Sequence, residues 1–121
     1  MTVTGRGEIE VAPDQAILDL GGEARAASFD DALAGAGRAV FEMTEVLRGH
    51  GVGDADLRTQ GPHTWTITDD GGRVDAYVCS LQLTARVGDP AVAGRWLAEC
   101  AVAAGDTGRA NGVRFAVRDR A

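Results

Sequence analysis

Hydrophobic and polar residues alternate with a period of two along the first part of the chain. From Val3 to Val11 the odd positions hold valine, glycine or isoleucine, and the even positions hold threonine, arginine or glutamate. The alternation resumes over residues 16–24, so each stretch predicts a half-buried strand. A shared inward face pairs Ile9 with Leu18, and the two strands are expected to close as a hairpin around residues 12–15.

The next pattern has a helical period. Ser28 and Asp31 resemble a capping box at the start of a helix. The apolar positions that follow are three or four residues apart and form one stripe: Phe29, Leu33, Ala36, Val40, Met43 and Leu47. His50-Gly51 predicts the end of the helix, since glycine suits a left-handed cap. Residues 51–61 are expected to form a connector.

A second hairpin is predicted in the middle of the chain. His63, Trp65 and Ile67 alternate with threonines, and a longer alternation begins at Tyr77. If both apolar sets share a face, the loop between them holds an odd number of residues. A three-residue loop over residues 70–72 with a glycine bulge satisfies this condition and places Trp65 opposite Tyr77.

The last third of the chain predicts a helix and a strand. Asp89-Pro90 starts the helix, with proline at its first position, and Gly105 ends it. The inward residues of this helix are expected to be Val92, Trp96, Leu97 and Cys100. The glycine-rich segment over residues 104–112 predicts a loop. A final strand is predicted from Val113, Phe115 and Val117.

The resulting element order is ββαββαβ. Each predicted strand is apolar on one face only, so both helices are expected to cover the same side. This predicts a single α+β domain over residues 1–121, a two-layer sandwich with a mainly antiparallel sheet of about five strands. The outer sheet face is expected to carry Arg6, Glu8, Asp19, Glu23, Thr64, Thr66, Thr84 and Arg86.

Charge and composition limit the kinds of molecule that the chain is expected to bind. A net charge of −6 at pH 7 argues against nucleic acid or an anionic membrane. All 12 basic residues are arginines, which excludes chemistry that needs a lysine. No apolar run approaches the roughly 18 residues of a membrane span. No signal peptide opens the sequence, so a cytoplasmic location is expected, or an envelope or secreted one if a leader has been removed.

Gly5-Arg6-Gly7 resembles a phosphate-binding turn. A dinucleotide fingerprint needs a third glycine where Glu10 stands, and it leads into a helix, whereas this segment continues as a strand. Close helix packing explains the glycines better, with Gly7 facing Leu20 and Gly5 facing Gly22. The first helix offers small residues to meet them: Ala32, Gly35, Ala36 and Ala39.

The other candidates for chemistry also have structural explanations. The segment over residues 68–73 lacks the spacing of a calcium loop and predicts a hairpin turn. His50 is expected at a helix end and His63 in a partly buried core position, neither with a second ligand at metal spacing. Ser28 and Ser80 lack a nucleophile-elbow context. No catalytic, metal or cofactor site is therefore predicted.

The two cysteines, Cys79 and Cys100, have no metal-ligand spacing. Both fall on predicted inward faces, so they are expected to be buried, and a position next to each other in the core is one of the arrangements left open. Free thiols are predicted, because nothing directs the chain to an oxidising compartment. A disulfide between them is the alternative, but no other feature of the sequence supports it.

Several stretches together resemble the SIMPL domain, also called DUF541. The most specific are V-x-G-x-G-x-I-x-V-x-P-D-x-A over residues 3–16, D-L-R-T-x-G over residues 56–61 and G-V-x-F over residues 112–115. The likeness runs along residues 2–119. Members are typically nearly twice as long and many carry an export signal, so the resemblance implies a front half without the family's C-terminal part.

The resemblance implies little chemistry. Family members include envelope proteins of Gram-negative bacteria linked to oxidative-stress tolerance, an outer-membrane-associated antigen and a eukaryotic adaptor that binds a Pelle-like kinase. Some members assemble into hollow homo-oligomers, and none brings a catalytic residue set that matches positions in this sequence.

Two functions are compatible with these observations. The first is a non-enzymatic structural or interaction domain that self-associates as a dimer or a multiple of one, through a strand edge or a helix rim, with a further protein partner left open. The alternative is a small-ligand-binding protein or weak enzyme that uses concave polar groups near His63, Trp65 and Tyr77.

Overall fold

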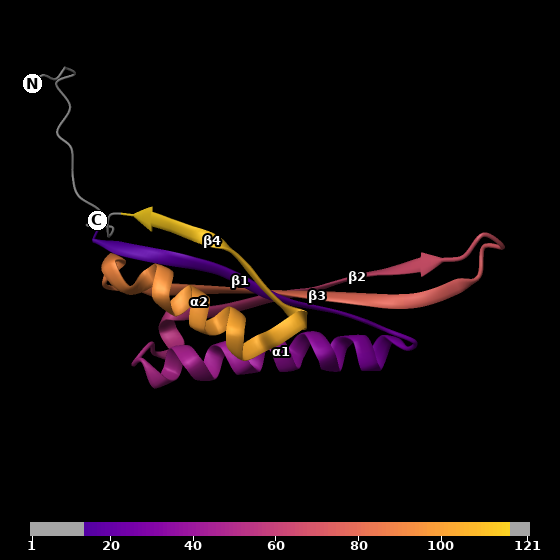
Figure 1. Ribbon diagram of the computed structural model, residues 1–121, viewed down its shortest axis with the longest axis horizontal. Coiled ribbons are helices and arrows are strands. Elements are labelled where there is room, and N and C mark those ends of the chain that lie inside the picture. The colour runs from indigo at the N-terminus through magenta and orange to yellow at the C-terminus, as the bar shows by residue number, and fades with distance from the viewer. Residues whose placement is uncertain (1–13, 117–121) are drawn as a thin grey trace, which may run out of the picture.

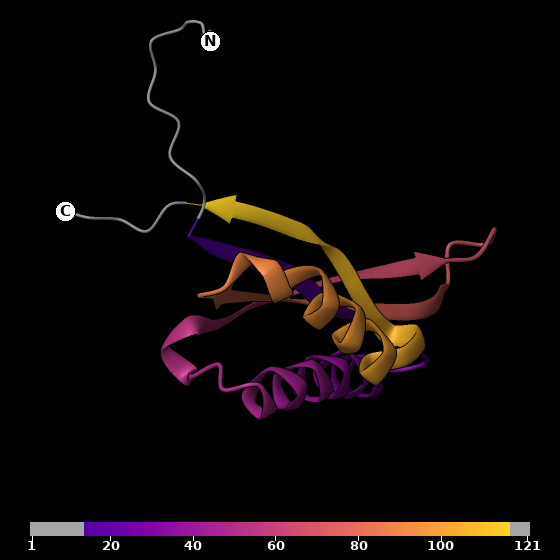
Figure 2. The same ribbon diagram turned by 60° about the vertical axis from the view of Figure 1, so that its left-hand side comes forward.

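The computed structural model describes residues 14–116 of the chain. Within them, four strands form one antiparallel sheet in the order β2-β3-β1-β4. Two helices cover one face of this sheet, as the two views in Figures 1 and 2 show. The elements are β1 (Gln15–Ala26), α1 (Phe29–Gly49), β2 (Leu57–Thr68), β3 (Val74–Val87), α2 (Ala93–Ala104) and β4 (Gly108–Ala116). The predicted α+β two-layer class is confirmed, and the strand predicted over residues 3–11 lies outside the described residues.

The centre of the sheet is β1, whose two edges are both occupied. Leu18, for example, pairs with Ala85 on β3 and with Val113 on β4. Ile9 lies outside the described residues, and with it the predicted pairing of Ile9 with Leu18; within the described part both edges of Leu18 are occupied by other strands. Alternation identifies the face that each residue takes, whereas the choice of neighbouring strand depends on the whole sheet.

The first helix begins and ends where the sequence predicts. The Ser28 hydroxyl accepts from the Asp31 backbone N–H at 3.2 Å, and His50 caps the C-terminus. Gly51 follows with φ of 94°, which favours glycine. The buried stripe of this helix consists of Ala32, Ala36, Ala39, Val40, Met43 and Leu47.

Small residues let α1 lie directly on the backbone of the sheet. A Cβ added at Gly22 would overlap the carbonyl oxygen of Ala36 and lie 2.9 Å from the Ala39 Cβ. Likewise, a Cβ added at Gly35 would lie 2.7 Å from the Ala24 Cβ. Close helix packing is therefore confirmed at Gly22, while residues 5–7 lie outside the described part.

The core has two clusters, and each holds one cysteine. Cys100 lies in the larger cluster between both helices and the sheet, and Cys79 lies with alanines under the start of α1. The Cys79 thiol donates to the Phe29 carbonyl at 3.9 Å, and the Cys100 thiol donates to the Met43 carbonyl at 3.7 Å. These carbonyls are about 20 Å apart along α1 at 1.5 Å per residue. The two cysteines are therefore not neighbours, and both are free thiols, because a disulfide between them is out of reach.

The second helix follows its predicted signals. The Asp89 carboxylate accepts from the Ala91 backbone N–H at 2.9 Å, Pro90 opens a 3-10 turn and α2 ends at Gly105 with φ of 70°. Its predicted inward residues do pack on the core: Val92, Trp96, Leu97 and Cys100.

Two segments predicted as connectors are strands in the structure. β4 starts at Gly108, inside the predicted loop over residues 104–112, and β2 starts at Leu57, inside the predicted connector over residues 51–61. Both belong to edge strands with mostly exposed side chains, and residues 57–61 and 108–112 lack the apolar alternation that marks the later part of each strand. Phe115, one of the residues that predicted the final strand, is 58% exposed.

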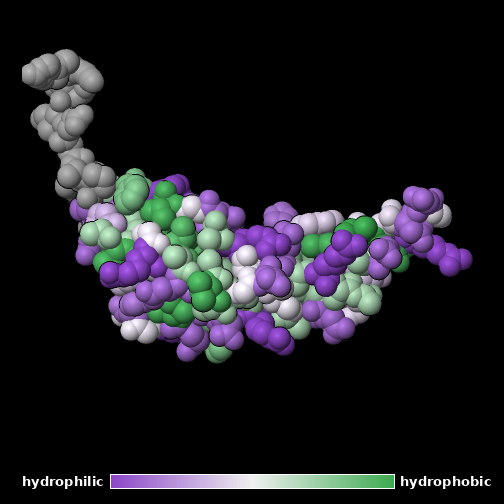
Figure 3. All heavy atoms as spheres, in the orientation of Figure 1, coloured by the Kyte–Doolittle hydropathy of each residue, from purple (hydrophilic) through white to green (hydrophobic). Residues whose placement is uncertain are grey.

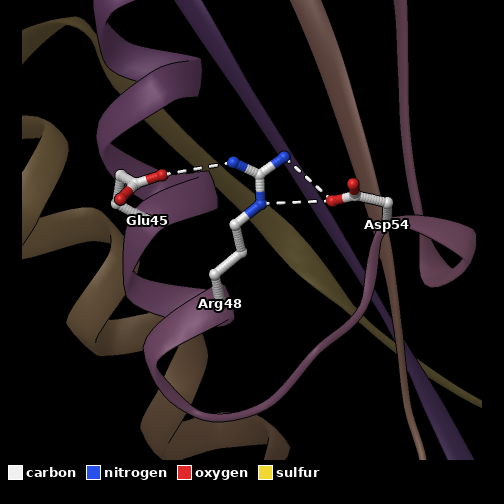
Figure 4. Close-up of polar contacts among 3 residues, drawn as sticks. All are labelled: Glu45, Arg48 and Asp54. Atoms are coloured by element: carbon white, nitrogen blue, oxygen red, sulfur yellow. Dashed lines mark hydrogen bonds and ion pairs between the residues drawn. The ribbon is translucent and has the colours of Figure 1, made fainter.

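An exposed ion-pair cluster joins the end of α1 to the turn before β2 (Figure 4). The Arg48 guanidinium donates to the Asp54 carboxylate at 2.9 Å and 3.2 Å, and to the Glu45 carboxylate at 3.3 Å. From there β2 and β3 run out as a hairpin that extends beyond both helices (Figure 1). Figure 3 shows that the tip of this hairpin is hydrophilic.

Candidate functional site on the outer sheet face

The turn between β2 and β3 has the predicted length. The Asp69 backbone N–H donates to the Arg73 carbonyl at 2.8 Å, which leaves three residues, 70–72, in the loop. The Asp69 carboxylate accepts from the backbone N–H groups of Gly71 and Arg73 at 2.9 Å and 3.0 Å. Such local bonds explain why an Asp-Asp-Gly-Gly segment forms a turn.

A bulge directly after the turn changes the facing of the hairpin. Thr68 pairs with Val74 but Ile67 pairs with Ala76, so Asp75 is an extra residue on β3. One extra residue reverses which side chains share a face. Trp65 therefore lies opposite Val78, and the predicted placement of Trp65 opposite Tyr77 is wrong.

A second bulge, nearer the start of β2, reverses the facing again, so that the first half of β2 has the facing it would have without either bulge. Gln60 pairs with Gln82 and His63 pairs with Ser80, so Gly61 and Pro62 together stand opposite the single residue Leu81. Only the segment between the two bulges, residues 63–67, is turned over relative to the rest of the strand. Thr64 and Thr66, predicted on the outer face, consequently pair with helix-side residues of β3.

The predicted site residues are divided between two faces of the sheet. His63 and Trp65 lie on the outer face, and both are exposed, so His63 is not the core residue that was predicted. Tyr77 lies on the helix side, where it packs against the cluster of Ala24, Ala32, Ala36 and Cys79. The structure brings His63 and Trp65 to one surface and separates Tyr77 from them.

A groove of about 530 Å³ lies on the outer face beside His63. Gly21 is part of its floor, and a Cβ added there would lie 2.6 Å from the Leu81 carbonyl oxygen. Residue 21 therefore has to be glycine, and the missing side chain leaves space for the groove above this part of the sheet. All four strands contribute side chains to this groove: Glu23, Gln60, His63, Ser80, Gln82, Arg109 and Asn111.

These groove residues form two cross-strand rows. Gln60, Gln82 and Gly21 follow one another across β2, β3 and β1, and His63, Ser80 and Glu23 form the next row. Sequence reasoning missed the glutamines and Asn111, because they lie on segments that were predicted as connectors or as plain solvated faces. The alternation of β3 was the one available signal, since it places Gln82 outward.

A second hollow adjoins the first. It has a volume of about 360 Å³, is lined by Trp65 and Val78, and shares Glu23 and Arg109 with the groove. The Trp65 side chain is 46% exposed, whereas Val78 opposite it is 4% exposed. Trp65, with Val78 and Ile67 beside it, gives this hollow an apolar wall.

Charges on the outer face are largely paired. Arg109 lies 3.7 Å from Glu23, Arg25 lies 3.6 Å from Asp75, and Arg114 donates to both oxygens of Asp19 at 2.9 Å and 3.2 Å. This last hydrogen bond raises the pKa of Arg114, which keeps its guanidinium charged.

The end of the face near Arg114 is richer in arginine. A shallow hollow of about 280 Å³ there includes Arg58, Arg86 and Arg114. Arg86 is 3.9 Å from Asp56, and within residues 14–116 no carboxylate lies within ion-pair distance of Arg58.

Reactive groups are few in the described part of the chain. No group of three or more histidine, cysteine or acidic side chains there is placed to hold a metal ion. Burial raises the pKa of Cys79, and burial together with the charge of Glu99 raises the pKa of Cys100 to about 11. Both thiols therefore stay protonated near neutral pH, which is the opposite of an activated nucleophile.

The comparison with protein families agrees with the fold and with the three sequence motifs. The family described as "Protein of unknown function (DUF541)", SIMPL, matches residues 1–121, the whole chain. The chain belongs to the SIMPL family. No curated protein matches it significantly. SIMPL membership carries no assigned activity, so the function of this SIMPL chain has to be argued from its own surface.

The SIMPL chain also shows no helix suited to a membrane. Within residues 14–116, neither α1 nor α2 combines the length and the apolar character that a bilayer crossing needs.

Proposed function

We propose that this chain is a non-enzymatic interaction domain that self-associates through the edge of β4. The open edge is the observation that carries the proposal, because within residues 14–116 β4 pairs on one side only, with β1. An unpaired strand edge presents a row of backbone donors and acceptors to which a strand of a second chain can pair.

The other edge strand, β2, is less suited to such pairing. Pro62 lies near its middle and has no backbone N–H to donate. The bulge at Gly61-Pro62 also disrupts the edge of β2 locally, which hinders the addition of another strand. β4 has one bulge as well, at Asn111, but it contains no proline, so each of its residues keeps a backbone N–H.

Phe115 supplies an apolar contact next to the β4 edge. Its side chain is 58% exposed at a position opposite Ala16, on the side of the sheet that the helices cover. Pairing of two β4 strands around a two-fold axis satisfies both edges with one patch and brings two such phenyl rings to the interface.

Light scattering coupled to size exclusion, across a dilution series, tests this proposal. We expect a mass of twice 12.5 kDa, or a multiple of that, at high concentration. Phe115→Asp is expected to weaken association at least tenfold, because a carboxylate resists burial at an interface. Phe41→Asp is the matched control, since Phe41 on α1 is also 58% exposed.

Two outcomes contradict the proposal. A mass of 12.5 kDa at every concentration removes self-association altogether. Equal weakening by both substitutions removes β4 as the interface, since Phe41 lies on the helix layer.

A redox activity forms no part of the proposal. Burial raises the pKa of both thiols, and the two cysteines are too far apart to form a disulfide, so neither supports the oxidative-stress link that the resemblance implies. The competing ligand-binding function loses Tyr77 from its residue set, but the groove on the outer sheet face is a specific observation in its favour.

A further inference from the structure

The outer groove is polar without being ionic. Its charged pair, Glu23 and Arg109, is mutually neutralising at 3.7 Å. The side chains of Gln60, Gln82 and Asn111 have no hydrogen-bond partner within residues 14–116. Each primary amide offers two donors and one acceptor oxygen, so this surface can form a dense set of neutral hydrogen bonds.

The neighbouring hollow adds an apolar wall to this polar surface. Trp65 is two residues from His63 on the same face, and the two hollows share Glu23 and Arg109. A molecule that lies along both hollows therefore meets amide groups at one end and an exposed indole face at the other. The face of an indole carries partial negative charge and attracts polarised C–H groups.

Few ligand classes combine these properties. Sugar rings carry many hydroxyl groups on their rim and C–H groups on one face, so they match amides beside an indole. An extended peptide is matched less well, because peptides pair with strand edges rather than with the middle of a sheet face. An anion has no unpaired cation in the groove, because Arg109 is paired with Glu23.

We propose that the outer-face groove formed by Gln60, Gln82 and Asn111, with the adjoining Trp65, binds a neutral oligosaccharide. The combined hollows, about 530 Å³ and 360 Å³, are of the size of small-molecule sites. The site is separable from the proposed self-association, because Phe115 lies on the helix side of the sheet, whereas Asn111 of β4 faces the groove on the outer side.

Nuclear magnetic resonance of the two indole N–H groups tests the site directly. The chain has two tryptophans, so Trp65→Phe assigns the Trp65 signal and leaves that of Trp96. Cellohexaose, maltohexaose, chitohexaose and xylohexaose are titrated to 10 mM. We expect at least one to shift the Trp65 signal saturably and to leave the Trp96 signal in place.

Variants of exposed residues connect the shift to the groove. Trp65→Ala and Gln60→Ala are each expected to weaken binding at least tenfold. Binding to these variants is measured from the shifts of the backbone amide signals of β3. Phe41→Ala is the matched control, because it removes an exposed aromatic side chain from α1, away from the groove. Thermal unfolding of each variant confirms that it is folded.

Hexagalacturonate is titrated beside the four neutral sugars as an anionic comparison. Three outcomes overturn the inference: no saturable shift with any of the five, a shift that Gln60→Ala leaves unchanged, or binding of hexagalacturonate alone. The last result would identify an anion site near Arg58 instead. Because Phe115→Asp leaves the groove intact, that variant is expected to bind sugar normally, so failure of one proposal is distinguishable from failure of the other.

Discussion

Single glycines and small residues set how closely the two layers of this domain approach. Gly22 lies where α1 crosses β1, with Ala36 and Ala39 directly above it. Because protein interiors are close-packed, even one added methyl group forces a shift of the helix backbone.

Gly22→Ala is therefore expected to destabilise the fold by about 1–3 kcal/mol, the usual cost of overpacking. Gly37→Ala on α1 is the control, because nothing lies within 4 Å of the added Cβ there. Alanine favours the helix over glycine, so the control is expected to gain roughly 0.5–1 kcal/mol. Urea unfolding measures both values, and a neutral Gly22→Ala variant would show that the helix is not in close contact.

The Cys100 thiol makes stability depend on alkaline pH. Burial, with the charge of Glu99, raises its pKa from 9.0 to about 11. The folded state therefore binds the thiol proton more tightly than the unfolded state does. This contribution is fully present below pH 9 and is lost as the pH rises through about 11.

We expect the free energy of unfolding to fall more steeply between pH 9 and pH 11 in the natural sequence than in Cys100→Ala. Denaturant unfolding at several pH values measures the two slopes. Parallel pH profiles would argue against a buried thiol at this position.

At the scale of elements, the C-terminal end of α1 is joined to the middle of α2 by a contact between side chains. The His50 Nε2 lies 2.6 Å from the Glu99 carboxylate, and the His50 ring stacks on Trp96 with centroids 4.3 Å apart and an interplanar angle of 11°. Stacked rings contribute about 0.5–1.5 kcal/mol beyond their buried area.

His50→Ala is expected to lower the free energy of unfolding by about 1–2 kcal/mol, because it removes the stack and the hydrogen bond together. Asp54→Asn, at the same end of α1, is expected to cost less than about 1 kcal/mol, since it breaks only an exposed ion pair. Thermal or urea unfolding compares them. If Asp54→Asn lowers the free energy of unfolding more than His50→Ala does, the ion pair contributes more to stability than the contact between the helices, contrary to this prediction.

At the scale of the whole molecule, the strands differ in how well they are supported. β1 is paired on both edges and its inward residues are buried, whereas nearly all of β2 is exposed. Backbone hydrogen bonds that are open to water exchange sooner than those in a packed centre.

Hydrogen exchange followed by mass spectrometry is expected to show slow exchange in β1 and β3 and fast exchange in β2. If β4 mediates self-association, its protection is expected to increase with protein concentration while that of β2 stays constant. Concentration-dependent protection of β2 instead would place the interface on the hairpin.

Much of the fold was predictable from local signals. The capping serine, the terminal glycines of both helices and the three-residue turn are each determined by neighbours a few residues away. The apolar stripe of α1 was predicted correctly from Ala36 to Leu47, but Phe29 at its start is 40% exposed. The groove on the outer sheet face was less predictable. Of its residues, His63 and Trp65 were singled out, but their face was assigned wrongly and the amides were not recognised.

Register is the physical reason for that difference. The sequence by itself determined the elements, the two-layer class and the family, because period, caps and turn residues act locally. Only the tertiary structure decided that β1 pairs with β3 and β4 and that two bulges, at Asp75 and Gly61-Pro62, reverse the facing of residues 63–67. One extra residue in a strand moves the side chains that follow it to the opposite face of the sheet. The position of such a bulge depends on packing across the whole sheet rather than on the pattern of the strand that contains it.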